Sequence, residues 1–102
     1  MPTVRSVNSI PIRLTEERWF HIVENHNDLA GYYEDILAAV ESPDMVVQGY
    51  GKAMIALSRR NKEPCLAVVC KELSTSDGFI ITAYFTSRAK IEKEAVIWQK
   101  QP

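Results

Sequence analysis

The sequence lacks the features that mark several classes of protein. It has 102 residues with a formal net charge of -1, and only two of its residues are cysteines. No apolar run approaches the roughly 20 residues that a membrane-spanning helix needs. The amino terminus, from Met1 to Arg5, has no apolar segment of the kind found in secretory signals. We therefore expect no membrane segment and a cytoplasmic location.

The small number of cysteines and the low net charge argue against a disulfide and against a general attraction for nucleic acid. Cys65 and Cys70 are five residues apart in one strand-like run, so their side chains should point to opposite faces of a sheet. That geometry does not favour a disulfide, and we interpret both as reduced packing residues. A chain with almost no net charge has no general attraction for nucleic acid. Any contact with RNA would have to use a local patch of cations.

The composition that remains is typical of one soluble globular domain, with 46% hydrophobic and 25% charged residues. We predict a single domain over residues 1–102. A first helix should begin after Thr15, a typical N-cap residue, with a stripe at helical spacing made of Trp19, Ile22, Val23 and His26. A second helix, capped by Asn27 or Asp28, should run until Pro43 ends it.

From Met45 onward the hydrophobic period changes from 3.6 to 2, which predicts strands. The expected strands, with an earlier edge strand, are 9–14, 45–48, 53–60, 65–73 and 79–87. Short turns between the later strands predict an antiparallel meander with both helices before it. Val96 to Trp98 fits a short closing strand and, with Ile91, also fits a helix.

The most strand-like run follows the turn at Asp77-Gly78. Period two places one set of residues on the core face: Phe79, Ile81, Ala83 and Phe85. The other face should carry Ile80, Thr82, Tyr84 and Thr86. Three hydroxyl groups in a row can form a solvated strand surface, and they can also donate hydrogen bonds to phosphate.

The histidines are the main candidates for chemistry. His21 and His26 are five residues apart, about 140° around a helix, which does not suit a two-histidine metal site. Neither the cysteines nor a carboxylate cluster completes such a site, so we expect no metal and no cofactor. His26 ends the apolar stripe, and its ring must find a polar partner on whatever the helix packs against. The cations Arg59, Arg60 and Lys71 lie near strand ends.

The order of these parts resembles the metal-independent nucleases of the barnase, EndoU, colicin and RelE-like group, and more closely its phage-associated branch. The residues that carry the resemblance are 21–26, 37–44, 78–86, 90–91 and 97–98. The resemblance implies an α+β fold in which two amino-terminal helices pack on a four- to five-stranded antiparallel sheet. It also implies endoribonuclease chemistry in which the ribose 2′-hydroxyl is the nucleophile.

In that chemistry the protein supplies a base, an acid and donors for the phosphate. By resemblance, His26 is the general base or acid, Thr82 donates to a phosphate oxygen, and Tyr84 donates likewise or stacks on a base. The substrate contacts would come from His21, Arg59, Arg60 and Lys71. The expected partners are RNA and an antitoxin or immunity-type protein that neutralises a toxin. The alternative is an inactive relative that serves as a protein- or RNA-binding regulatory module.

Overall fold

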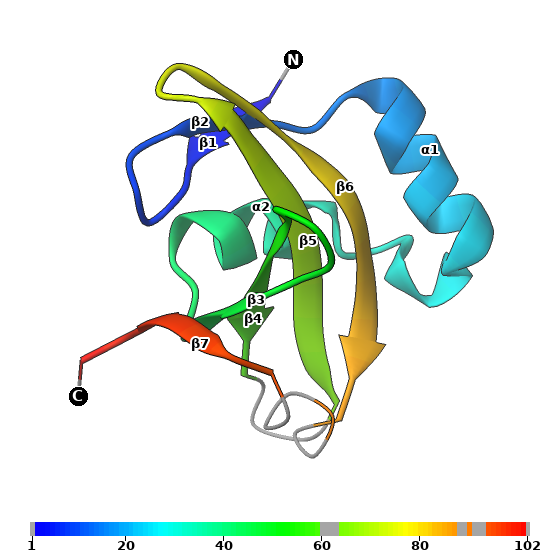
Figure 1. The fold of residues 1–102 in the computed structure, drawn as a ribbon. Helices are drawn as coiled ribbons and strands as arrows, with labels where there is room; N and C mark the ends of the chain where they lie inside the picture. The colour runs from blue at the N-terminus through cyan, green and yellow to red at the C-terminus, as the bar shows by residue number, and fades with distance from the viewer. Residues whose placement is uncertain (1, 60–63, 88–89, 91–93, 102) are drawn as a thin grey trace.

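The computed structural model describes residues 2–59, 64–87, 90 and 94–101, which form one curled sheet with helices beside and behind it (Figure 1). The sheet has seven strands in the order β1-β2-β6-β5-β4-β3-β7. The strands are β1 (Thr3–Arg5), β2 (Pro11–Arg13), β3 (Met45–Gln48), β4 (Met54–Ser58), β5 (Cys65–Ser74), β6 (Asp77–Thr86) and β7 (Val96–Gln99). The helices are α1 (Glu16–Asn25), the 3-10 helix η1 (Asn27–Leu29) and α2 (Tyr33–Glu41).

The predicted fold class is wrong. The sheet has seven strands rather than four or five, it curls into a half-barrel, and it is mixed because β2 runs parallel to β6. The predicted edge strand 9–14 contains β2, but the three-residue strand β1 is too short to show a period-two pattern, and β7 has a sequence that also fits a helix. A parallel pairing between strands more than 60 residues apart, at Arg13 and Phe79, leaves no local signal in the sequence.

Helix α1 begins where the sequence predicts and covers an edge of the sheet. The Thr15 hydroxyl accepts a hydrogen bond from the Arg18 amide at 3.1 Å, and the helix ends at Asn25. Strand β2 pairs with β6 only at Arg13 and Phe79. Beyond Phe79, α1 packs against β6 in place of another strand (Figure 1).

The second helix differs from the prediction. Instead of one helix from Asn27 or Asp28, the chain forms the short η1, a turn through Gly31, and then α2. The Tyr32 ring lies edge-on to Phe85 of β6, with their centroids 5.2 Å apart. Leu29, which is fully buried, fixes the first piece in the core. Tertiary packing therefore divides a stretch whose apolar spacing looks continuous.

The main core lies between α2 and one face of the sheet. Helix α2 contributes Ile36, Leu37, Ala39 and Val40. The strands contribute Ile12, Val46, Met54, Ala56, Leu66, Val68, Cys70, Ile80 and Ala83. Each of these side chains is almost fully removed from water, so this face supplies most of the hydrophobic stabilisation.

Strand β6 contains a β-bulge that changes the predicted faces. Val69 is opposite Thr82 and Cys70 is opposite Ile80, which leaves Ile81 as an extra residue. Ile80 therefore joins Ala83 in the main core, contrary to the prediction that it lies on the other face. Strict alternation holds only after the bulge.

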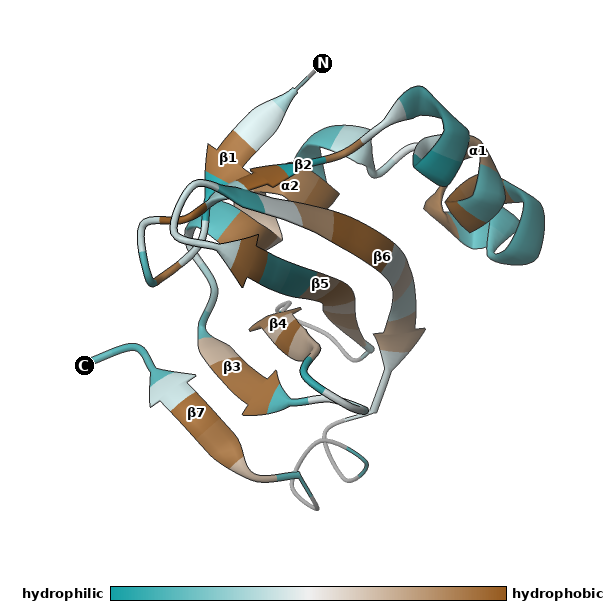
Figure 2. Ribbon diagram, turned by 45° about the horizontal axis from the view of Figure 1, so that its top comes forward, coloured by the Kyte–Doolittle hydropathy of each residue, from teal (hydrophilic) through white to brown (hydrophobic). Residues whose placement is uncertain are grey.

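The sheet has a second apolar face. Val47, Leu57 and Ala67 form a smaller cluster there, and Met45, Ile55 and Tyr84 pack against it. Figure 2 shows hydrophobic residues along β3, β6 and β7, while α1 is largely hydrophilic on the side away from the sheet. Helix α2 covers only the face with the main core. The second apolar face is therefore the one on which a ligand could bind.

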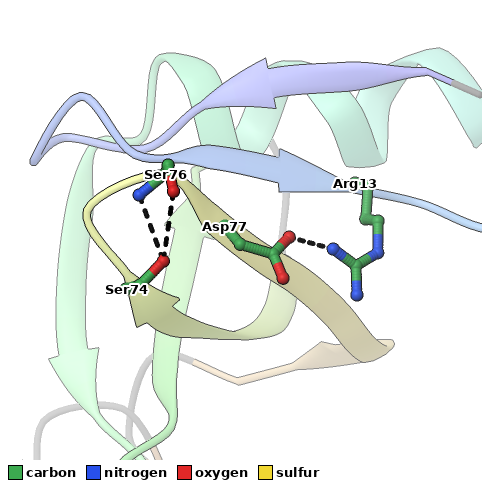
Figure 3. A network of polar contacts seen from close by, with 4 residues as sticks. All are labelled: Arg13, Ser74, Ser76 and Asp77. Atoms are coloured by element: carbon green, nitrogen blue, oxygen red, sulfur yellow. Dashed lines mark hydrogen bonds and ion pairs between the residues drawn. The ribbon is translucent and has the colours of Figure 1, made fainter.

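An ion pair joins β2 to β6 at the point where the two strands meet. The Arg13 guanidinium donates to the Asp77 carboxylate (Figure 3). Next to it, the Ser76 amide donates to the Ser74 hydroxyl at 3.2 Å and closes the β5–β6 turn. Both charged side chains are more than one third exposed, so the pair adds little to the free energy of unfolding.

Candidate functional site

His26 lies at the point where α1 ends and η1 begins. Its amide donates to the Ile22 carbonyl at 2.8 Å, and its own carbonyl accepts from the Leu29 amide at 2.9 Å. The backbone on both sides of the histidine is therefore held by hydrogen bonds. The half-buried ring projects from this fixed corner towards the end of β6.

The ring that His26 meets is Tyr84. The two ring centroids are 6.2 Å apart and the planes are tilted by 38°. This separation is within the range in which aromatic rings interact favourably. The structure thus brings together two residues that are 58 positions apart in the sequence, one from a helix end and one from a strand.

Thr82 and Thr86 flank Tyr84 on the same face of β6. In the β5–β6 ladder, Thr82, Tyr84 and Thr86 are opposite Val69, Ala67 and Cys65. Because no bulge interrupts this part of the ladder, all three hydroxyl-bearing side chains share one face. That face is the second apolar face, not the face covered by α2.

A pocket of about 270 Å³ opens on this face. Its floor consists of aliphatic side chains from three neighbouring strands: Val47, Ile55, Leu57 and Ala67. Ala67 is opposite both Leu57 and Tyr84, so a small side chain lies between two large ones. The floor is therefore a shallow apolar surface of sheet.

The rim of the pocket is polar. Tyr84 and Thr86 form one side of it, and Lys90 and Glu94 form another. Burial, and to a smaller extent the negative charge of Glu94, raise the pKa of the Tyr84 phenol above its ordinary value. Tyr84 therefore remains a protonated hydrogen-bond donor at neutral pH.

The predicted substrate contacts are spread over the molecule. Arg59 is exposed just after β4, at the end of the sheet where Thr86 lies, and its amide donates to the Asp44 carboxylate at 2.7 Å. Lys71 is on the same face as Tyr84 but four residues along β5 from Ala67, about 13 Å away. His21 is exposed on α1. Arg60 lies outside the described residues.

Charge is divided unevenly between the helices and the rest of the chain. Residues 16–41 carry seven acidic and one basic side chain, a net charge of -6. The rest of the chain carries eleven basic and six acidic ones, a net charge of +5. The formal charge of -1 therefore hides an acidic helical segment and a basic remainder, which bears the strands.

Sequence reasoning missed the pocket and the roles of Lys90 and Glu94 at its rim. The available signal was the run from Cys65 to Val69, which is apolar at every position. Such a run predicts a strand buried on both faces, and hence a second apolar surface. The sequence carries no comparable signal for which charged residues reach that surface.

Within the described ranges, no three or more His, Cys, Asp or Glu side chains lie close enough to hold a metal ion together. None of the helices formed there is long and apolar enough to cross a lipid bilayer. Comparisons with protein-family models, with curated proteins and with solved structures gave no match to this chain.

Proposed function

We propose that this protein is a metal-independent endoribonuclease whose active site is built around His26 and Tyr84. The observation that carries the proposal is the pairing of these two rings at the edge of β6. Cleavage by 2′-hydroxyl attack needs a proton acceptor and a proton donor on one surface. An imidazole beside a protonated phenol supplies both.

The reaction begins when His26 accepts the proton of the ribose 2′-hydroxyl. The 2′-oxygen forms a bond to phosphorus while the bond from phosphorus to the 5′-oxygen breaks. The leaving oxygen takes a proton from a donor in the site, and the Tyr84 phenol, which is protonated at neutral pH, is that donor. Thr82, on the same face, donates a hydrogen bond to a phosphate oxygen as its charge grows. The products are a 2′,3′-cyclic phosphate and a free 5′-hydroxyl.

The distribution of charge is compatible with this role. Phosphate is attracted to the basic part of the chain and repelled by most of the acidic helical segment, so RNA would lie along the strands and reach this segment where α1 ends at His26. Arg59 is exposed at the Thr86 end of the sheet. A strand of RNA that passes Tyr84 in that direction would approach this cation.

The test is incubation of the purified protein with single-stranded RNA in EDTA. His26→Ala should lower the cleavage rate by about 100-fold or more, which is the usual contribution of a general base or acid. His21→Ala removes the histidine within α1 and should raise KM a few-fold with little effect on kcat. The 3′ product end should be a cyclic phosphate.

Activity that survives His26→Ala at the wild-type level would overturn the assignment. Tyr84→Phe separates the two roles proposed for Tyr84. It removes the donor but keeps the ring, so a loss of kcat identifies proton donation and a normal kcat identifies stacking.

A second candidate function follows from the acidic helical segment. A non-catalytic module that binds a protein through this segment, such as an antitoxin or immunity-type protein, needs a surface of one charge sign. It predicts no RNA turnover by the wild-type protein and a partner complex that weakens as salt is added.

A further inference from the structure

The pocket beside Tyr84 has two rim residues that the catalytic proposal does not use. Lys90 and Glu94 line it together with the hydroxyl-bearing residues of β6. Both are exposed, while the floor beneath them is buried sheet. An apolar floor with a donor and an acceptor at its edge suits a flat ring with polar groups on its perimeter.

We infer that this pocket holds one base of the RNA and that it favours bases with an exocyclic amino group over uracil. This inference rests on the proposed function. It adds a base preference to a site in which His26 and Thr82 act on the RNA backbone.

The size and surface of the pocket favour a base over the other parts of a nucleotide. A volume of about 270 Å³ is below the range of roughly 300–1,000 Å³ for pockets that hold drug-sized ligands. One ring system fits this volume better than a whole nucleotide does. The carboxylate of Glu94 repels phosphate, and the aliphatic floor provides no donors for it. The base therefore enters the pocket while the phosphate stays near His26.

The amino preference comes from the chemistry of the two rim charges. A carboxylate only accepts hydrogen bonds, and an ammonium group only donates them. Cytosine, adenine and guanine each offer an amino group to Glu94 and a ring nitrogen or carbonyl to Lys90. Uracil has no amino group, and its one donor on this edge, N3–H, lies between two carbonyl oxygens that would face the carboxylate unfavourably.

The experiment measures binding of 3′-CMP, 3′-AMP and 3′-UMP to the full chain by calorimetry, with ribose 5-phosphate as the probe that lacks a base. One charge-assisted hydrogen bond predicts that CMP and AMP bind about tenfold more tightly than UMP. Glu94→Gln should bring that ratio close to one, and Glu94→Lys should shift it towards UMP. Glu24→Gln, an exposed carboxylate on α1, is the matched control and should leave the ratio unchanged.

Equal binding of the three nucleotides, or a preference that persists in Glu94→Gln, overturns the inference. The proposed function is tested separately by cleavage of RNA. Cleavage without a base preference leaves the nuclease standing and removes the base pocket. A base preference without cleavage supports the pocket and overturns the nuclease.

Discussion

Cys70 shows how strongly the environment of one residue can change its chemistry. Its side chain is on the core face of β5. Burial, with a smaller effect from the Glu72 carboxylate, raises the pKa of the Cys70 thiol from 9.0 to about 12. The thiolate, which is the reactive form, is therefore suppressed at neutral pH, in agreement with the interpretation of Cys70 as a reduced packing residue.

This shift predicts that the protein loses stability in alkaline solution. Above pH 9 the unfolded chain gives up the thiol proton while the folded chain keeps it, so the unfolding free energy falls as the pH rises from about 9 towards 12. The loss from this one group is at most about 1.4 kcal/mol per pH unit. Urea unfolding between pH 8 and pH 10 should show a smaller decline for Cys70→Ala than for the wild type.

Val68→Ala is the control for that measurement. It also shortens a core side chain of β5, so it lowers stability without removing a titrating group. Its decline with pH should match that of the wild type. If Cys70→Ala declines as steeply as Val68→Ala, the thiol does not account for the effect.

At the scale of elements, β6 determines most of the architecture. It pairs with β2 on one side and with β5 on the other, and it carries both the bulge at Ile81 and the candidate site. The bulge allows the first half of the strand to present Ile80 to the core and the second half to present Ala83 and Phe85. Without the bulge, period two would still place Thr82, Tyr84 and Thr86 on one face. Ile80 would then lie on that face too, away from the core.

Gly78 allows β2 to approach β6. A Cβ atom at this position would lie 2.5 Å from Cδ1 of Ile12 and 2.7 Å from the carbonyl oxygen of Lys71. The second neighbour is backbone within the β5–β6 ladder and cannot move aside without disturbing the pairing. The parallel contact between β2 and β6 thus depends on the absence of a side chain here.

We therefore expect Gly78→Ala to lower the free energy of unfolding by about 1–3 kcal/mol, the usual cost of overpacking. Gly31→Ala is the matched control, because a Cβ atom there has no neighbour within 4 Å. That change should be neutral or stabilise the protein by about 0.4–1 kcal/mol through the unfolded state. Denaturant unfolding of the two variants measures the difference, and equal stabilities would contradict the steric argument.

At the scale of the whole molecule, the separation of charge should guide RNA. The acidic helical segment and the basic remainder together predict that most of the phosphate backbone lies along the strands and meets the helical segment where α1 ends at His26. Strand β4 provides a comparison, because exposed cations lie just beyond its two ends. Arg59 follows β4 at the Thr86 end, and Lys52 precedes it at the opposite end.

Under the proposed function, Arg59→Glu should weaken binding of single-stranded RNA more than Lys52→Glu does. Both variants change the net charge by the same amount, so a difference between them reports position. Loss of a phosphate contact also lowers the slope of log affinity against log salt concentration by about one. Filter binding at several salt concentrations measures both quantities, and equal losses in the two variants would count against this path for RNA.

Several features could be predicted from the sequence because they depend on neighbours along the chain. The Thr15 cap and the start of α1 are local, and so are the strands β3 to β6 with their short connections. The placement of Thr82, Tyr84 and Thr86 on one face also follows from period two. The roles of these residues in catalysis remain predictions.

Other features depended on contacts between distant parts of the chain. The edge strand β1, the parallel pairing of β2 with β6, and the extra residue Ile81 gain their stability from tertiary hydrogen bonds and packing, so local pattern does not reveal them. For β7, local pattern left a strand and a helix equally open, and pairing with β3 decided for the strand. The division of the second predicted helix into η1 and α2 has the same origin.

By itself, the sequence determined that the run after Gly78 is a strand with three hydroxyl-bearing side chains on one face, and that a helix before it ends in a histidine. Only the tertiary structure decided that this histidine meets Tyr84, because α1 covers the edge of β6 that β2 leaves open. The physical reason is that periodicity fixes where a side chain points within its own element, while the packing of apolar surfaces fixes which elements become neighbours.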